Sequence, residues 1–414
     1  MRKSPSKVFQ NLINEIISED GCRDFKEIFI ELDSLNKNKF KKIILENKLS
    51  SYFIDFIGKN NLLYLFDKTF LENCEYQKKR FQINSLNIIR EAQQLHKVFV
   101  SEGLNPIYLK GMAFQREYDD IALRPFVDID ILFDKSELLK VYETLHEKNF
   151  LAKTEKKYLN GKNIEDFCSK FHHIHLITKN NISIELHHRL TETRFFLECP
   201  IVKNFYKGAR NEDFFGEKIR IPSIENLIVH QLCHFFFSDF KGLIRTLSDI
   251  KIITRNHKVN FYEILSRIEN KKIRKSLILS LELIHDSNIK IENLNQIRSV
   301  YRNDYPNKQI ISEAREKLFD TRKKLRVENL FDNINKSDEA FTVLARKIFP
   351  ERNSLIYEYK IPKPNNLIIF KAYIRHFFKQ LFKLKDLVFL FKNTYKDGDN
   401  LKYTNATYLW FNRN

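Results

Sequence analysis

The stretch YLKGMAFQREYDDIALRPFVDIDILF, from Tyr108 to Phe133, combines a short apolar run, a lysine–glycine pair and a second apolar run that carries two aspartates. Side chains two residues apart on a β-strand point to the same face, so Asp128 and Asp130 would project together while their apolar neighbours pack in the core. Two adjacent carboxylates repel each other, and a divalent cation between them removes that repulsion. The spacing therefore predicts a strand that carries a metal site.

Apolar residues recur at helical spacing before and after this region, whereas residues 104–221 contain runs that favour strands. The sequence predicts strands at Pro106–Leu109, Phe126–Phe133, His172–Thr178 and Ile182–His188, and helices at Met112–Asp119 and Lys135–Lys148. Four parts follow: a helical N-terminal unit (1–103), a small mixed-sheet core (104–221), a C-terminal helical unit (222–349) and a basic amphipathic tail (350–414). The expected fold class is α+β, rich in helix. Gly103 is expected to end the helix before the core and Ser223 to cap the helix after it.

A third carboxylate lies in the strand predicted at Ile182–His188. Glu185 is on the opposite face from its apolar neighbours in NISIELHHRL. If this strand lies beside the one that carries Asp128 and Asp130, the three acids form a triad suited to Mg²⁺. In that arrangement the two aspartates would hold both metal ions, and Glu185 would bind the one that activates the acceptor hydroxyl.

A glycine turn precedes the aspartates. Lys110 and Gly111 stand where the first strand ends and a helix begins. Glycine lets the backbone approach a ligand closely, and a helix N-terminus offers N–H groups to phosphate oxygens. Lys110 and Arg124 would add positive charge beside a triphosphate. The sequence therefore predicts a phosphate-binding turn next to the metal site.

Together these motifs resemble the polymerase β-like nucleotidyltransferase superfamily. More narrowly, LKGMAF, LRPFVDIDILF and IELHHRL are similar to the motifs of a nucleotidyltransferase family marked by Leu-Lys-Gly, Arg-Pro-x-x-Asp-Ile-Asp-Leu-Leu and Glu-Leu-His. The similarity covers about residues 107–190, and HQLCHFF with LIRTLSDIKII resembles a later helical segment of that family. The resemblance implies transfer of a nucleotidyl group from a nucleoside triphosphate such as ATP. It also implies Asp128, Asp130 and Glu185 as metal ligands, with Lys110 and Gly111 at the phosphates.

Two features depart from the superfamily pattern. Met112 follows the turn glycine where a glycine or serine is usual, so one phosphate-binding hydroxyl is missing. The segment between Gly111 and Asp128 is also longer than in many members. Its DDIALRP loop is predicted to form a lid or a substrate contact.

Structural roles compete with these assignments. Any half-exposed strand shows the alternation of apolar and polar residues seen in residues 126–133. Glu185 could be an acidic residue on an exposed strand edge. Lys110 could simply face solvent at a strand end. His187 or His188 could orient the substrate or act as a base, although a structural histidine in the strand is an equal alternative. The combination of motifs favours the active-site interpretation over the separate structural ones.

Two other groups of histidines favour structural roles. His230 and His234 have a spacing suited to zinc, but VHQLCHFFF lacks the glutamate of His-Glu-x-x-His and indicates a packed core helix. FHHIH, with His172, His173 and His175, favours a strand at the edge of the core.

The composition limits the class of protein. Across 414 residues, 71 Lys and Arg against 53 Asp and Glu give a formal charge of +18, which favours an anionic partner such as nucleotide, nucleic acid or acidic lipid. The five cysteines are scattered and include no CxxC pair, which argues against a disulfide framework or a cysteine zinc site. No signal peptide and no membrane-spanning run is recognisable, so a cytoplasmic protein is expected.

The tail contains a predicted basic amphipathic helix from Leu367 to Lys392. Its apolar stripe comprises Phe370, Ile374, Phe377, Leu381, Leu384, Val388 and Phe391, and a ridge of Lys371, Arg375, Lys379 and Lys383 runs beside it. Such a helix can bind an anionic membrane surface or nucleic acid, or it can dock on the protein's own helices. Docking is favoured, because an exposed stripe of this kind promotes aggregation.

The sequence as a whole predicts a magnesium-dependent nucleotidyltransferase that moves a nucleoside monophosphate to a hydroxyl or phosphate acceptor. A sugar phosphate, a small molecule, a tRNA end and a protein hydroxyl are all compatible acceptors. The resemblance implies surface polysaccharide or peptide-modification metabolism. The alternative is an inactive relative whose basic surface binds nucleic acid or membrane, but the intact acidic triad favours the enzyme.

Overall fold

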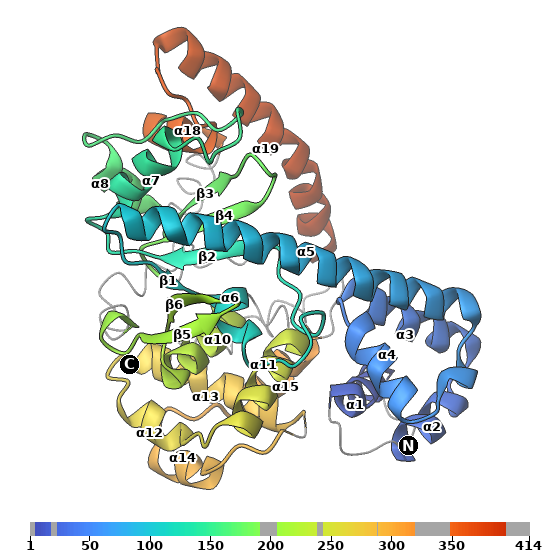
Figure 1. The fold of residues 1–414 in the computed structure, drawn as a ribbon. Coiled ribbons are helices and arrows are strands. Elements are labelled where there is room, and N and C mark those ends of the chain that lie inside the picture. The colour runs from blue at the N-terminus through green and yellow to red at the C-terminus, as the bar shows by residue number, and fades with distance from the viewer. Residues whose placement is uncertain are drawn as a thin grey trace. The chain divides into compact units, whose positions relative to one another are not determined.

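The computed structural model describes residues 5–17, 23–190, 205–237, 243–287, 289–318 and 348–394 (Figure 1). The chain divides into two compact units, which are described separately. Unit 1 comprises Met1–Lys135, His172–Leu176 and Ile182–Phe319, and unit 2 comprises Ser136–Phe171, Ile177–Asn181 and Asp320–Asn414. Helices predominate and a six-stranded mixed sheet lies among them, so the predicted α+β class is confirmed. The four parts expected from sequence stay predictions.

The elements have the following bounds. In unit 1 the helices are α1 (Pro5–Ile17), α2 (Arg23–Glu31), α3 (Ser34–Glu46), α4 (Ser50–Lys59), α5 (Lys68–Ser101), α6 (Lys110–Gln115), α10 (Ile224–Phe237), α11 (Leu243–Asn256), α12 (Phe261–Ser266), α13 (Lys271–His285), α14 (Leu294–Val300) and α15 (Lys308–Leu318), with the short 3-10 helix η1 (Leu63–Leu65). In unit 2 they are α7 (Leu138–Glu147), α8 (Ile164–Lys170), α18 (Arg352–Glu358) and α19 (Asn366–Thr394). The strands are β1 (Ile107–Tyr108), β2 (Asp128–Leu132), β3 (His173–Ile177), β4 (Ser183–His187), β5 (Arg210–Phe214) and β6 (Glu217–Ile221).

Phenylalanines form the core of the N-terminal helices in unit 1. Phe25 contacts Phe56 with ring centroids 5.0 Å apart, and Phe53 meets Phe66 edge-on at 4.9 Å. Edge-to-face aromatic pairs stabilise a core beyond the area that they bury. The high phenylalanine content of this part of the chain therefore accounts for how short helices assemble into a stable cluster.

Helix α5 connects this cluster to the sheet. It packs on α4 and on β2, and Figure 1 shows it as a long helix running from one to the other. Asp67 caps its N-terminus by accepting a hydrogen bond from the Phe70 amide at 2.9 Å. Its C-terminus is followed by Gly103 in the left-handed conformation, φ +72°, as expected for the residue that ends this helix.

The sheet has the strand order β3-β4-β2-β1-β6-β5. β2 lies in its interior, parallel to β4 and antiparallel to β1. Ile129 and Ile131 of β2 and Ile184 and Leu186 of β4 are fully buried, as expected for apolar residues that alternate with polar ones. The strands predicted around β1, β2, β3 and β4 are confirmed, and their pairing positions the acidic residues.

The hairpin of β5 and β6 was not predicted. Its first strand reads RNEDF and lacks the β-branched residues that mark a strand. The two strands nevertheless pair antiparallel over five residues, from Arg210↔Ile221 to Phe214↔Glu217. Phe215 and Gly216 form the turn, both with positive φ, which suits a two-residue hairpin connection.

Helix α10 follows the sheet and contacts α6, α11 and α13. The hydroxyl of Ser223 accepts a hydrogen bond from the Asn226 amide at 3.3 Å, so the predicted cap is confirmed. Because α6 begins at Lys110 and Gly111, this packing places α10 against the helix that carries the predicted phosphate turn.

Unit 2 is held together by polar contacts between segments distant in sequence. The Tyr357 hydroxyl donates to Asp166 at 2.7 Å, and Lys360 donates to Glu155 at 2.8 Å. Within α19, Ile369, Ala372 and His376 are buried.

The face of α19 that is buried differs from the predicted one. Phe370 is 61% exposed and Ile374 is 43% exposed, so the prediction that this stripe docks on the protein is wrong for both residues. The stripe from Leu381 onward lies outside the described side chains. Among the described helices, none is long and apolar enough to cross a membrane.

Candidate active site

Strand pairing brings two of the three predicted acids together. In the parallel register of β2 and β4, Asp130 is the direct neighbour of Glu185, and Asp128 is the neighbour of Ser183. Asp128 and Asp130 are two residues apart on one strand and so share a face with Glu185. Asp130 is 1% exposed, while Asp128 and Glu185 are half-buried. The three predicted ligands therefore lie on one face of two adjacent strands.

Lys110 lies on this acidic group. Its Nζ is 2.7 Å from Asp130 Oδ1 and 3.4 Å from Glu185 Oε2. Its backbone has φ +41°, a conformation that is uncommon for a residue with a side chain and that clusters at functional sites. The sequence interpretation placed Lys110 at the phosphates, and the structure shows its ammonium group on the carboxylates.

Histidines complete the cluster. His187, which is 1% exposed, has its Nε2 2.9 Å from Asp130 Oδ1 and 3.2 Å from Glu185 Oε2. His173 Nε2 is 3.7 Å from Glu185 Oε1, and His173 Nδ1 is 2.7 Å from His172 Nε2. The β3 histidines were expected only to form an edge strand, but the order β3-β4-β2 brings them to the carboxylates.

The electrostatics of the group show both repulsion and compensation. Burial and then the neighbouring Asp130 carboxylate raise the pKa of Asp128 to about 6. Burial alone would raise the pKa of Asp130, but the Lys110 ammonium and the His187 hydrogen bond outweigh it and hold that pKa well below its usual range. Burial would likewise lower the pKa of Lys110, yet Asp130 and Glu185 raise it to about 12. Positive partners thus outweigh burial at Asp130, whereas burial and repulsion outweigh the positive neighbours at Asp128.

A family comparison shows what kind of protein this is. The family model described as uncharacterised nucleotidyltransferase matches residues 33–287, which is more than half of the chain. The chain belongs to this nucleotidyltransferase family. It is therefore an enzyme that transfers nucleotidyl groups, and a nucleoside triphosphate is the substrate that the family implies. Neither the curated proteins nor the solved structures contain a match to the chain.

A divalent cation fits the acidic group of this nucleotidyltransferase. Asp130, Glu185 and His187 each offer a ligand atom, and the three atoms lie within 4.8 Å of one another. Asp130 Oδ2 is buried and has no hydrogen-bond partner. An unpartnered buried carboxylate oxygen is costly, and coordination of a cation would satisfy it. The Lys110 ammonium beside it shows that the position accommodates positive charge.

Gly111 is required by packing in this nucleotidyltransferase. A Cβ atom at Gly111 would lie 2.5 Å from Cβ and 2.7 Å from Cγ of Phe126, the residue two positions before Asp128. Atoms this close cannot be accommodated without moving the backbone. The turn that carries Lys110 therefore packs directly against Phe126, just before β2 begins. The predicted role of Gly111 at the phosphates stays a prediction.

We expect Gly111→Ala to lower the free energy of unfolding by about 2 to 3 kcal/mol, since the added methyl overpacks the contact with Phe126. Gly58→Ala is the matched control, because no atom lies within 4 Å of its would-be Cβ and the residue is inside α4. That control should raise stability by up to about 1 kcal/mol. Urea unfolding of the two variants measures the difference, and equal stabilities would contradict the packing argument.

Arg124 has a different setting from the other basic residues of the nucleotidyltransferase. It is 3% exposed, its Nε donates to Asp249 Oδ1 at 2.7 Å, and its guanidinium lies over the Phe114 ring. The Tyr118 hydroxyl donates to the same oxygen at 2.7 Å. Asp249 belongs to the LIRTLSDIKII segment that resembles the family. The charge of Arg124 is therefore already matched, and its contact with phosphate stays a prediction.

Sequence reasoning missed two other basic residues near Asp128. Arg245 of α11 lowers the pKa of Asp128, and Lys48, in the turn between α3 and α4, interacts electrostatically with Asp128 and Arg245. Lys48 has φ +60°, again unusual outside glycine. No local motif marks them, because they come from segments about 80 and 117 positions away from Asp128 in the chain. Together they place positive charge on the Asp128 side of the site.

The remaining predicted histidines have structural settings. His188 is buried beside His187, and its amide donates to His172 O at 3.1 Å. His230 is 2% exposed and lies edge-on to Phe205, with ring centroids 6.0 Å apart. Among the described residues, neither His230 nor His234 belongs to a group that could hold a metal. The burial of His230 agrees with the packed-helix interpretation of VHQLCHFFF, whereas His234 is exposed.

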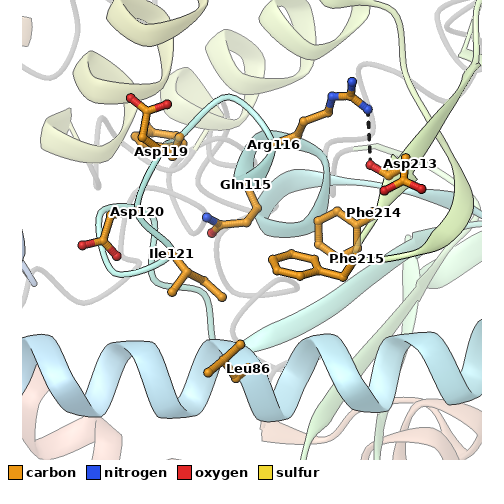
Figure 2. Close-up of a pocket in the computed structure, with 10 residues that line it drawn as sticks. Leu86, Gln115, Arg116, Asp119, Asp120, Ile121, Asp213, Phe214 and Phe215 are labelled. Carbon is orange, nitrogen blue, oxygen red and sulfur yellow. Dashed lines mark hydrogen bonds between the residues drawn. The ribbon is translucent and has the colours of Figure 1, made fainter.

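A pocket of about 440 Å³ lies at the C-terminal end of α6. Its lining residues are Leu86, Gln115, Arg116, Tyr118, Asp119, Asp120, Ile121, Asp213, Phe214 and Phe215. Figure 2 shows Gln115 extending from α6 between the loop that carries Asp120 and Ile121 and the hairpin that carries Phe215. Part of the DDIALRP loop therefore lines a cavity, and its substrate contact stays a prediction.

Proposed function

We propose that the enzyme transfers a nucleoside monophosphate from a nucleoside triphosphate to an acceptor at the acidic group, with Mg²⁺ as the metal. The observation that carries the proposal is the register of β2 and β4, which makes Asp130 and Glu185 neighbours with Asp128 on the same face. Paired carboxylates on adjacent strands supply the hard oxygen ligands that Mg²⁺ takes.

Asp128, Asp130 and Glu185 would hold the metal. When bound there, Mg²⁺ would neutralise charge on the phosphates and orient the reacting oxygens. The elevated pKa of Asp128, caused by burial and by Asp130, supports this assignment because a cation would relieve the same repulsion. His187 donates to both Asp130 and Glu185, so it fixes the orientation of two of the three carboxylates.

Basic residues around the carboxylates would bind the triphosphate. Lys110 keeps Asp130 and Glu185 compensated in the free enzyme. We propose that its ammonium group turns to a phosphate oxygen when the substrate arrives, as the glycine turn suggests. Lys48 and Arg245 supply further positive charge on the Asp128 side. Positive side chains from three separate segments of the chain would then neutralise the charge of the triphosphate.

The proposal is tested by pyrophosphate release. Purified full-length enzyme incubated with a nucleoside triphosphate and acceptor-containing cell extract should release pyrophosphate only when Mg²⁺ is present, and EDTA should abolish the release. Extract without the enzyme is the control for background hydrolysis. Release that is unaffected by EDTA would contradict the magnesium assignment.

A further inference from the structure

A cluster of three histidines lies beside the acidic group, and the proposed reaction uses only His187 among them, to orient the carboxylates. His172, His173 and His187 each offer a ring nitrogen, and the three nitrogens lie within 4.8 Å of one another. His172 and His173 enter from the start of β3, and His187 enters from the end of β4, which is its neighbour in the sheet. The strand order therefore gathers three imidazoles from two segments.

The contacts within the cluster are close. His172 Nε2 and His173 Nδ1 are 2.7 Å apart, and the ring centroids of His172 and His173 lie 5.5 and 5.1 Å from that of His187. Tetrahedral zinc with Zn–N bonds of about 2.0 to 2.1 Å needs ligand nitrogens about 3.3 Å apart. The facing nitrogens of His172 and His173 are closer than this, and all three ring nitrogens lie within 4.8 Å of one another, so small side-chain rotations would bring them to that separation. His172 and His173 are half-buried, which leaves a route from solvent.

His187 provides the second, independent observation. Its Nε2 is occupied by Asp130 and Glu185, both hydrogen-bond acceptors. Its Nδ1 is buried and has no hydrogen-bond partner, in a side chain that is 1% exposed. Metal-bound histidines characteristically donate their other ring N–H to a carboxylate. His187 has this arrangement, with one nitrogen committed to carboxylates and the other without a partner.

The donor atoms of the cluster indicate which class of ion fits it. Imidazole nitrogens suit Zn²⁺ and its neighbours in the transition series, whereas Mg²⁺ prefers oxygen.

We propose that His172, His173 and His187 bind a zinc-like transition-metal ion beside the proposed magnesium ligands. The three histidines leave a fourth position for water, and Glu185, a proposed magnesium ligand, borders it with its Oε1 3.7 Å from His173 Nε2. Binding through the unpartnered Nδ1 of His187 leaves Nε2–H directed at Asp130 and Glu185. The ion thereby holds His187 in the orientation that positions both carboxylates.

Cobalt substitution tests the site directly. Full-length protein without a polyhistidine tag, stripped with a chelator, is titrated with Co²⁺, whose tetrahedral complexes absorb strongly in the visible. We expect one equivalent to give this absorption and Zn²⁺ to displace it. His172→Gln and His173→Gln, singly and together, should weaken Zn²⁺ binding, the double variant by about 100-fold or more.

Two controls separate this site from its neighbours. His175→Gln makes the same change on the same strand at an exposed histidine, and its Zn²⁺ affinity should equal that of the wild type. Asp130→Asn removes a proposed magnesium ligand and should retain the cobalt absorption. Circular dichroism shows whether each variant is folded. Weaker Zn²⁺ binding is attributed to the site only when at least one single histidine variant shows it and stays folded.

The outcomes distinguish this inference from the proposed function. Absence of the tetrahedral absorption, or its persistence in the double histidine variant, would overturn the site. Absorption that is lost in Asp130→Asn but kept in the double histidine variant would place the ion on the carboxylates and would also overturn it. Since Co²⁺ binding is measured without nucleotide, failure of pyrophosphate release would leave the result unaffected.

Discussion

Asp130→Asn should lower the rate of nucleotidyl transfer by about 1,000-fold, the equivalent of about 4 kcal/mol of transition-state stabilisation. Asp130 is the acid at the centre of the group, since its Oδ1 meets both Lys110 and His187 and its Oδ2 is buried without a partner. It is also the direct neighbour of Glu185. Asparagine keeps the shape but removes the charge, so Lys110 loses an ion pair and the proposed metal loses a ligand charge. Initial rates of pyrophosphate release measure the effect.

Asp134→Asn is the matched control for this change. Asp134 follows β2 by two residues and is exposed, so the same substitution there should leave the rate within about twofold. Urea unfolding of both variants checks that neither loss reflects a disrupted fold. An Asp130→Asn enzyme that stays folded and keeps near-normal turnover would show that the reaction does not depend on this carboxylate.

Arg124→Leu should lower the free energy of unfolding by about 3 to 5 kcal/mol, because it leaves a buried carboxylate without its partner. Asp249 is fully buried, and its Oδ1 receives hydrogen bonds from both Arg124 and Tyr118. Removing the guanidinium leaves the Tyr118 hydroxyl as the hydrogen-bond partner of that oxygen, while Oδ2 has none. The double variant Arg124→Leu/Asp249→Leu removes both charges and should recover most of the stability. Urea or thermal unfolding of the full chain measures the changes.

Arg267→Leu is the control for the arginine change. Its side chain is 66% exposed and pairs with Glu263 one helical turn away, so the loss should stay below about 1 kcal/mol. If Arg124 instead contacts the triphosphate, Arg124→Leu would lower the free energy of unfolding no more than Arg267→Leu does. The same change would raise the KM for the nucleotide. That pair of results would contradict the structural role of Arg124.

The parts of the site that lie on strands could be predicted from sequence. Asp128, Asp130 and Glu185 each alternate with apolar residues, and alternation fixes which face a side chain takes. The sequence predicted the triad only on the assumption that these two strands are neighbours. It could not predict their pairing, because the register of β2 and β4, which are 50 residues apart, depends on the whole sheet. Once that pairing is established, the triad follows from the sequence pattern.

Contacts between distant segments could not be predicted in the same way. The partner of Arg124 is Asp249, 125 residues later, and the charges near Asp128 come from Lys48 and Arg245. None of these pairs has a local signature, since long-range ion pairs depend on how helices pack. For the same reason FHHIH indicated a strand but not its neighbour, and the proximity of His173 to Glu185 was missed.

The face of α19 was misjudged for a related reason. Helical spacing shows that an apolar stripe exists, but not whether a surface is available to cover it. In the described part of the helix, Ile369 and Ala372 are buried and Phe370 is exposed, so the buried face is displaced from the predicted stripe by one residue, about 100° around the axis. The expected anionic membrane or nucleic-acid partner of this helix stays a prediction.

The most direct test of the central claim follows the two ends of the triphosphate separately. The enzyme is incubated with Mg²⁺, cell extract and a nucleoside triphosphate labelled at either the α or the γ phosphorus, in parallel with Asp130→Asn. Attack of an acceptor oxygen on the α phosphorus forms a bond to that phosphorus and releases the other two phosphates as pyrophosphate. The account predicts that label from the α position enters the acceptor, that label from the γ position leaves as pyrophosphate, and that Asp130→Asn loses both. Entry of γ label into the acceptor, or undiminished α transfer by Asp130→Asn, would contradict it.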